Sequence, residues 1–279
     1  MTSADITVVK CGGAIAASPD HMCADLAKRC ALGERLVLVH GGAAAIDELA
    51  AALGIPRRPL LAPGGLESFH TSPAMLDVVT MAMTGRVKPR LLAALHAAGV
   101  SAVGLTGLDG GMLTARRKAA RRAVVDGRTI LVRDDHSGRI TGVNPLVPLA
   151  LLGLGTIPVI SPPAPDADGR PLNVDADRVA AALAVALGAR RLLLLTAAPG
   201  LLSDPADEST LLPRCVLPPA RELPRLAGAG MFRKLVAASE ALRGGVPEVR
   251  VCDGRTSEPV TRAVSGAGTE MFLSPEDPA

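Results

Sequence analysis

The chain has 279 residues, 48% of them hydrophobic, so it is long enough to bury a substantial core in one large domain or two smaller lobes. Its formal net charge is +3, and it contains no Trp, no Tyr and three Phe. Because it lacks both a general basic excess and aromatic side chains on which bases could stack, we expect no binding to nucleic acid.

The sequence has no features of export or membrane insertion. Its first residues lack the basic stretch and apolar core of a signal peptide. The longest apolar stretch, residues 146–160, is too short to span a bilayer and is interrupted by Pro and Gly, so we expect it in the core. The five cysteines are scattered and include no CxxC pair, which indicates reduced thiols in a cytoplasmic protein without a metal centre.

Short apolar runs alternate along the chain with segments rich in Ala and Leu. The runs predict buried strands at 6–10, 36–40, 102–106, 157–161, 192–196 and 249–252. The segments between them predict helices at 43–53, 74–98, 177–187, 231–243 and 258–264. This alternation predicts an α/β fold with a mostly parallel sheet. Residues 123–143 interrupt it with two extended runs, which indicate a β-hairpin, and the Pro-rich stretch 162–171 is a candidate lobe boundary.

Glycines follow the first two predicted strands. The first strand ends in Lys10-Cys11-Gly12-Gly13 and the second in His40-Gly41-Gly42 before a helix. Such glycines let backbone N–H groups approach a phosphate closely, although either motif alone fits a tight turn equally well. The sequence has neither the GxxxxGK[ST] nor the GxGxxG nucleotide motif, so neither explains these glycines.

Four further residues are candidates for chemistry. Lys10 closes an apolar strand, which is costly unless its ammonium faces a ligand or an acid. Asn173 and Asp177 precede or begin a predicted helix, where such residues also serve as ordinary caps. Lys234 lies in the first turns of another predicted helix, where a lysine is usually surface charge.

Taken together, these motifs resemble the amino acid kinase family, and in particular its acetylglutamate kinase branch. The resemblance covers nearly the whole chain and rests on the order of VVKCGG (8–13), LVHGGAAAIDELAAALGI (38–55), VGLTGLDGG (103–111), IPVISP (157–162), LNVDADRVAAALAVALGA (172–189), LLLLTAAPGLL (192–202), GMFRK (230–234), DGR (253–255) and GAGTEMF (266–272). The stretches TGLDGGMLTARRK (106–118) and VRDDHSGRITGVN (132–144) are most similar to kinases that act on glutamate or 2-aminoadipate attached to a small acidic amino-group carrier protein, in lysine or ornithine biosynthesis.

The resemblance implies a three-layer αβα sandwich with a mostly parallel sheet of about eight strands. It implies one kinase domain over residues 1–279, in which an N-lobe (1–165) holds the amino acid substrate and mediates dimerisation, and a C-lobe (166–279) holds ATP. Relatives that form arginine-inhibited hexamers have a helix before the first strand, and here Lys10 comes early, so we expect a homodimer.

The resemblance also implies roles for the candidate residues. Lys10 and Lys234 would stabilise the transferring phosphoryl group and Asp177 would hold both lysines in place. Gly12, Gly13, Gly41 and Gly42 would donate backbone hydrogen bonds, Asn173 would bind substrate, and Mg²⁺ would bridge the phosphates of ATP. A carboxylate is already a nucleophile at neutral pH, so positioning and charge neutralisation suffice for its phosphorylation.

A cluster of basic residues lies in the predicted hairpin region: Arg116, Arg117, Lys118, Arg121 and Arg122. Near the mouth of a substrate site, such a cluster would attract an acidic carrier protein and raise its association rate. The alternative is a solvated hairpin face with no partner.

Two positions depart from the family pattern. The family has an arginine two residues before the threonine that matches Thr71, where it grips the α-carboxylate of the substrate, and this chain has Phe69 followed by His70. His70, Arg57 or Arg58 would then substitute for it, or the substrate lacks a free carboxylate there. Ala197 replaces the Asp of the usual Thr-Asp-x-Pro-Gly loop near the nucleotide, which weakens the expected nucleotide affinity.

Other functions remain open on the sequence alone. One is an acetylglutamate kinase of arginine biosynthesis that acts on free N-acetylglutamate. Another is a non-catalytic homologue that binds nucleotide or carrier, which the substitutions at Phe69 and Ala197 favour. The retained Lys10, Asp177 and Lys234 favour an active kinase with altered substrate specificity.

Overall fold

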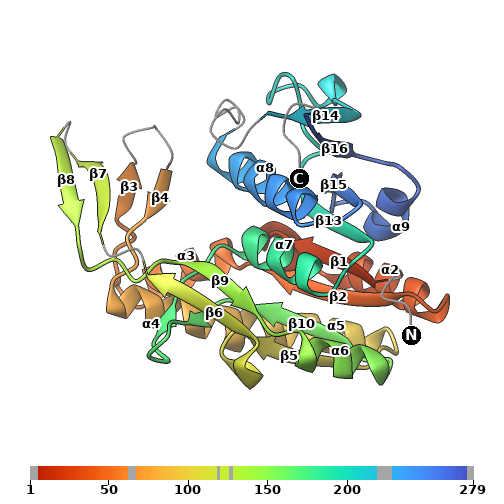
Figure 1. The fold of residues 1–279 in the computed structure, drawn as a ribbon, viewed down its shortest axis with the longest axis horizontal. Coiled ribbons are helices and arrows are strands. Elements are labelled where there is room, and N and C mark those ends of the chain that lie inside the picture. Colours follow the sequence, from red (N-terminus) through yellow and green to blue (C-terminus); the bar gives the residue numbers. More distant parts are fainter. Residues whose placement is uncertain (1–5, 62–66, 118–119, 126–127, 219–227, 275–279) are drawn as a thin grey trace.

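The computed structural model describes residues 6–61, 67–117, 120–125, 128–218 and 228–274. Its centre is an eight-stranded sheet in the order β14-β16-β15-β13-β1-β2-β10-β5 (Figure 1). The strands are β1 (Ile6–Cys11), β2 (Arg35–His40), β5 (Ala102–Thr106), β10 (Ile157–Ser161), β13 (Arg191–Thr196), β14 (Arg214–Leu217), β15 (Glu248–Asp253) and β16 (Thr269–Leu273). All neighbouring strands run parallel except β15 and β16, so the predicted mostly parallel sheet is confirmed.

Both faces of this sheet are covered, which explains why its central strands are continuous apolar runs. All six residues of β1 are buried. Successive side chains alternate between the faces: Ile6 and Val8 belong to one core cluster, and Val9 and Cys11 to the other.

Helices form the two outer layers (Figure 1). The first cluster is closed by α6 (Leu146–Gly153), α7 (Ala176–Ala186) and α8 (Gly228–Arg243). The second is closed by α1 (Gly13–Ala17), α2 (Asp20–Ala31), α5 (Lys88–Ala97) and α9 (Pro259–Val264). The three-layer αβα sandwich expected from the sequence is therefore confirmed.

The predicted helix 74–98 is one continuous helical rod with a change of pitch inside it. It begins as α4 (Pro73–Met81), continues through the π-helical η2 (Ala82–Val87) and ends as α5. The hydroxyl of Ser72 caps its start by accepting a hydrogen bond from the Met75 N–H, 3.2 Å away. Against this rod packs α3 (Ala43–Ala52), and the contact forms a third, smaller core cluster.

A small antiparallel sheet projects from one side of the body (Figure 1). Its order is β4-β3-β7-β8, made of β3 (Pro59–Leu61), β4 (Glu67–Phe69), β7 (Arg121–Val125) and β8 (Arg128–Val132). The predicted hairpin is confirmed for β7 and β8. The end of the predicted hairpin region forms β9 (Gly138–Val143). This strand does not join the hairpin but pairs with β6 (Leu113–Arg117).

The remaining short elements are β11 (Ala164–Pro165), β12 (Pro171–Leu172), η3 (Asp109–Gly111) and η4 (Glu208–Thr210). Residues 146–160 form α6 and β10. Their expected place in the core holds for β10 and Leu152 but is wrong for Leu146 and Leu154, which are 69% and 78% exposed at the ends of α6. None of the helices in the described residues combines the length and apolarity needed to cross a bilayer.

Candidate active site

Lys10 and Asp177 form a buried ion pair in the middle of the molecule. Strand alternation places Lys10 on the same face of β1 as Ile6 and Val8, which is the face covered by α7 and α8. Its Nζ lies 2.8 Å from Oδ1 of Asp177, in the first turn of α7. Each residue is only 5% exposed.

Lys234 joins this pair from a third element. It lies on α8, which packs against α7, and its Nζ is 3.5 Å from both carboxylate oxygens of Asp177. It too is almost fully buried, at 7% exposure. The structure thus brings together three residues predicted from the sequence, and we call Lys10, Asp177 and Lys234 the triad.

With both lysines protonated and Asp177 ionised, the triad carries one more positive than negative charge. Burial alone would raise the pKa of Asp177, but Lys10 and Lys234 outweigh it and lower that pKa. Burial opposes the charge of Lys10, yet its pair with Asp177 raises the pKa of Lys10 overall. Burial and the nearby Lys10 lower the pKa of Lys234. A buried net positive charge is costly unless an anion compensates it, so the triad is suited to bind a phosphate-like group.

The two glycine loops meet beside Lys10. The Gly41 N–H donates to the Cys11 carbonyl at 3.2 Å, which ties the loop after β2 to the end of β1. A Cβ on Gly13 would lie 3.0 Å from the Ala43 backbone nitrogen, so the loops touch where no side chain fits. Gly12 and Gly42 each precede a helix, and the N-terminus of the ten-residue α3 offers free N–H groups to an anion.

Two titratable neighbours of the triad are held neutral. Burial raises the pKa of Cys11 to about 12, so its thiol is not an ionised nucleophile at neutral pH. Burial also lowers the pKa of His40 to about 3, and its Nδ1 lies 3.1 Å from the Gly41 carbonyl oxygen. Cys11 and His40 are therefore uncharged at neutral pH, and burial together with Asp177 raises the pKa of the neighbouring Asp175.

Asn173 lies in the loop that leads to Asp177, and it is tied to the start of α4. Its Nδ2 donates to Oγ1 of Thr71 at 3.1 Å. The Thr71 N–H donates in turn to Oδ1 of Asp135 at 2.9 Å, and the His136 N–H donates to the Thr71 carbonyl at 2.7 Å. These hydrogen bonds join three segments that are distant in the sequence, around Thr71, Asp135 and Asn173, next to the loop that leads to Asp177.

Phe69 and His70 follow one another at the end of β4. The guanidinium of Arg57 stacks over the ring of Phe69, 4.4 Å from its centroid, and also pairs with Asp47. Nε2 of the buried His70 lies 3.1 Å from Oδ1 of Asp134. Arg58 is exposed. Two of the three side chains that were candidates to replace the missing arginine therefore already have acidic partners.

The predicted basic cluster is divided between two small sheets. Arg116 is exposed on β6 and Arg122 is exposed on β7. Arg117 is half-buried, and its guanidinium donates to the carbonyls of Asp135 at 3.0 Å and Arg133 at 3.3 Å, so it holds the turn after β8. Arg121 lies in β7, where its side chain is not described, and Lys118 lies outside the described residues.

Sequence reasoning missed two arginines, one beside the basic cluster and one beside the triad. Arg139 is exposed directly across from Arg116 in the β6–β9 pair, so two like charges face one another. Arg233, next to Lys234, donates from Nη2 to the Glu67 carbonyl at 3.0 Å, and its Nε lies 3.8 Å from Oδ2 of Asp175. The sequence did contain a signal for Arg233. Two acidic residues, Asp175 and Asp177, lie close together in the chain, and so do two basic residues, Arg233 and Lys234, which matches the two ion pairs that they form.

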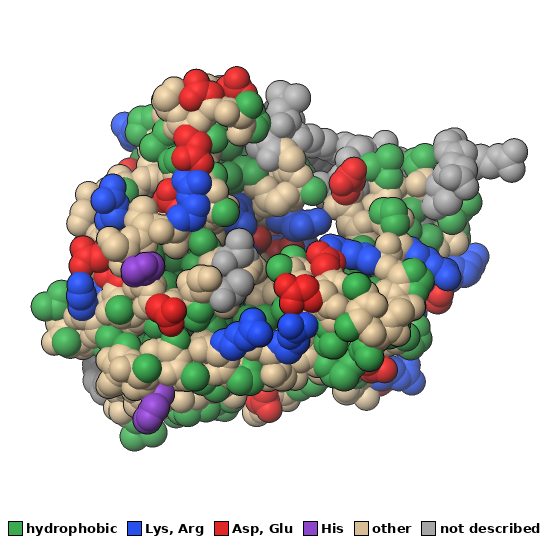
Figure 2. Space-filling model, turned by 180° about the vertical axis from the view of Figure 1, so that it is seen from behind, with side chains coloured by type: hydrophobic (Ala, Val, Ile, Leu, Met, Phe, Trp, Pro, Cys, Tyr) green, Lys and Arg blue, Asp and Glu red, His purple; other side chains and the backbone are tan. Residues whose placement is uncertain are grey.

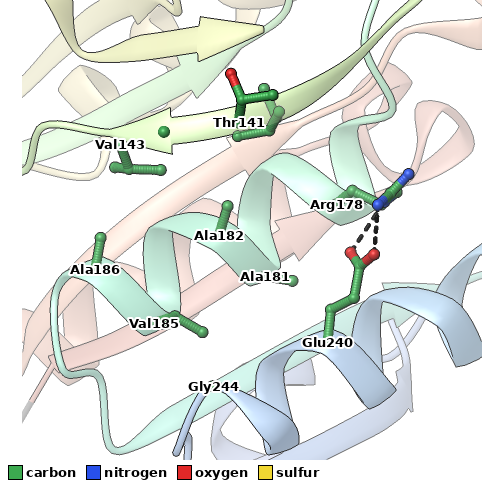
Figure 3. Close-up of a pocket in the computed structure, with 11 residues that line it drawn as sticks. Thr141, Val143, Arg178, Ala181, Ala182, Val185, Ala186, Glu240 and Gly244 are labelled. Carbon is green, nitrogen blue, oxygen red and sulfur yellow. Dashed lines mark hydrogen bonds and ion pairs between the residues drawn. The ribbon is translucent and has the colours of Figure 1, made fainter. Parts of the chain in front are cut away.

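A cavity of about 380 Å³ lies between β9, α7 and α8 (Figure 3). Ala181, Ala182 and Val185 form its apolar side, and Arg178 donates from Nε to Glu240 at 2.9 Å at one end. Its lining, drawn from the described residues, includes no member of the triad. The triad and this cavity are therefore separate features of the structure.

Several known proteins are similar to this chain in sequence. The pattern of the Amino acid kinase family matches residues 5–253. The chain is 40% identical over 265 residues to a [LysW]-aminoadipate kinase of Deinococcus radiodurans, covering 95% of this chain and 91% of that protein. It is 40% identical over 272 residues to the protein of the same name from Thermus thermophilus, covering 94% and 98%.

An acetylglutamate kinase of Salinispora tropica is also 40% identical, over 259 residues, covering 91% of this chain and 83% of that protein. Among solved structures, the carbamate kinase of Giardia superposes with a TM-score of 0.65 at 14% identity, covering 98% of this chain and all of that one, which supports the fold. With a family pattern over most of its length and full-length relatives at this identity, the chain belongs to the amino acid kinase family.

Proposed function

We propose that the protein transfers the γ-phosphoryl group of ATP to the side-chain carboxylate of a glutamate- or 2-aminoadipate-like substrate carried on a small acidic amino-group carrier protein. The observation that carries this proposal is the buried triad, with its excess positive charge beside two glycine loops. The names of the relatives from Deinococcus and Thermus favour the carrier-bound form of the substrate.

The chemistry needs no base. A carboxylate oxygen of the substrate attacks the γ-phosphorus, the bond from that phosphorus to the bridging oxygen breaks, and its electron pair leaves with ADP. Lys10 and Lys234 neutralise the charge that builds on the transferring group, and Asp177 keeps the two ammonium groups in place. The N–H groups around Gly12, Gly13, Gly41 and Gly42 hold the phosphoryl oxygens.

In this proposal ATP binds to the C-terminal half (166–279) and the substrate mainly to the N-terminal half (1–165), with Asn173 reaching the substrate from the C-terminal half. Mg²⁺ bound to ATP would neutralise part of the charge on its phosphates. Among the described residues, no group of three or more His, Cys, Asp or Glu side chains is placed to hold a metal ion, and both oxygens of Asp177 face lysines. The donors for Mg²⁺ are then mainly phosphate oxygens and water.

The carrier protein docks on the exposed arginines of two small sheets, the β6–β9 pair and the projecting sheet β4-β3-β7-β8. Arg116, Arg122 and Arg139 are exposed there, and their charge would attract an acidic partner in a salt-dependent way. We further propose a homodimer in the cytoplasm. All five cysteines, which lie in the described residues, are free thiols, as a reducing compartment would keep them.

A second candidate function is phosphorylation of free N-acetylglutamate, which the equal identity to the acetylglutamate kinase of Salinispora favours. The test compares kcat/KM for carrier-bound 2-aminoadipate and free N-acetylglutamate at low and high salt. We expect a preference for the carrier-bound substrate that weakens with salt, and Arg116→Glu should raise only its KM. An equal or higher kcat/KM for free N-acetylglutamate would identify the second function instead.

A further inference from the structure

Arg233 is an accessible cation between the triad and the projecting sheet. It is the residue before Lys234 on α8, so the two side chains leave the helix about 100° apart. Lys234 enters the buried triad, whereas Arg233, with its side chain 39% exposed, reaches the carbonyl of Glu67 on β4. Figure 2 shows an opening in the surface beside this sheet, around which basic and acidic side chains gather.

The contacts of Arg233 leave most of its hydrogen-bonding capacity available. A guanidinium has five N–H donors, and with the described residues Arg233 forms one Nη2 bond to a backbone carbonyl and one ion pair at 3.8 Å. Neither contact is the bidentate pair that arginine makes with a carboxylate at full strength. By contrast, Arg57 pairs with Asp47, and Arg117 donates to two carbonyls.

The position of Arg233 matches the shape of the substrate in the proposed function, on which this inference rests. A glutamate or 2-aminoadipate that is linked through its amino group keeps two carboxylates, one on the side chain and one beside the linkage. Two cations lie in the first turns of α8. Lys234 points towards the triad, where the reacting carboxylate would lie, and Arg233 points towards β4. Glu67 begins β4 and Phe69 ends it, so the second cation contacts the same short strand that carries the position where the family has its arginine.

We propose that Arg233 binds the second carboxylate of the substrate, the one beside the amide link, and so selects substrates that carry it. The Arg233 guanidinium then exchanges its single bond to the Glu67 carbonyl for a two-point contact with the ligand. Asp175, which also caps α7 by accepting from the Arg178 N–H at 3.1 Å, holds the guanidinium in position.

The experiment uses two substrates on the same carrier protein: 2-aminoadipate, and 5-aminopentanoate, which is the same molecule without the second carboxylate. The wild-type enzyme should prefer 2-aminoadipate. Arg233→Gln should lower kcat/KM for 2-aminoadipate by about 10- to 100-fold, mainly through KM, and leave 5-aminopentanoate nearly unchanged. Arg233→Lys should recover part of the loss, and adding Phe69→Arg to Arg233→Gln should restore the preference.

An equal loss with both substrates would overturn the proposal, because Arg233 would then only link α8 to β4. An unchanged kcat/KM for 2-aminoadipate in Arg233→Gln would overturn it as well. A wild-type enzyme inactive on both carrier-bound substrates but active on N-acetylglutamate would contradict the carrier-bound function. In that case N-acetylglutamate and N-acetyl-4-aminobutanoate give the same comparison, with the same two outcomes for Arg233.

Discussion

Replacing Asp177 by Asn removes the one negative charge of the triad while keeping the size of the side chain. Lys10 and Lys234 then lie buried around a neutral group, 2.8 and 3.5 Å from its polar end. Two opposite charges 4 Å apart attract by about 4 kcal/mol at an effective dielectric constant near 20. Relaxation recovers part of this, and breaking a buried pair usually costs about 3 to 5 kcal/mol.

We therefore expect Asp177→Asn to lower the free energy of unfolding by about 3 kcal/mol at neutral pH, measured by urea unfolding. Because Lys10 and Lys234 are no longer held in place, kcat should fall by about 100- to 1,000-fold. The two lysines depress the pKa of Asp177, so its contribution is present above the ordinary pKa of aspartate and is lost as pH falls through the lowered value. The difference in free energy of unfolding between the wild type and Asp177→Asn should therefore become smaller in that acid range.

The matched control is Asp175→Asn, two residues away in the same loop. Asp175 caps α7, and Asn is an equally good cap, so this change should cost well under 1 kcal/mol of stability. At saturating substrate it should leave kcat within about threefold of the wild-type value and act mainly on KM, because the contacts of Asp175 are with Arg178 and Arg233. If Asp177→Asn behaved like this control in both assays, the electrostatic account of the triad would be wrong.

Three further predictions concern the surroundings of the triad. Burial and Lys10 lower the pKa of Lys234, so kcat should fall as pH rises through a value below 10.5; a pH–rate profile of Lys234→Arg should lack that decline. Burial lowers the pKa of Lys88 to about 8, so between pH 8 and 10.5 the folded protein has lost this proton while the unfolded chain still holds it. The free energy of unfolding of the wild type should therefore rise by up to about 3 kcal/mol over this pH range relative to that of Lys88→Met. A difference between the two proteins that does not change with pH would contradict this. Gly13→Ala, whose Cβ would press on a backbone nitrogen at 3.0 Å, should lose about 1 to 3 kcal/mol by urea unfolding, whereas Gly153→Ala in α6, with open space around it, should be neutral or stabilising.

The central sheet and part of the triad could be predicted because their signals are local. Alternation along β1 determines the face on which Lys10 lies, and a first-turn position determines the end of α7 where Asp177 lies. A missed element, α2, also had a readable signal, with Asp20 in its first turn and Lys28 and Arg29 in its last.

The projecting sheet and the contacts of Arg233 could not be read in the same way. β3 and β4 have three residues each, too few to show a period. Arg233 and Glu67 are 166 positions apart, and their meeting depends on how α8 and β4 are placed around the sheet. The same holds for Lys234, since only the packing of α8 on α7 brings it to Asp177.

The most direct test of the central claim is hydroxylamine trapping of an acyl phosphate. Purified protein is incubated with Mg·ATP and 2-aminoadipate or glutamate on an acidic carrier protein, or with free N-acetylglutamate, and Lys10→Met serves as the control. We predict hydroxamate with the carrier-bound substrates, and a loss of at least about 100-fold in its rate of formation with Lys10→Met. No hydroxamate from any of the three substrates, with ATP still bound, would contradict phosphoryl transfer to a carboxylate and favour a binding role.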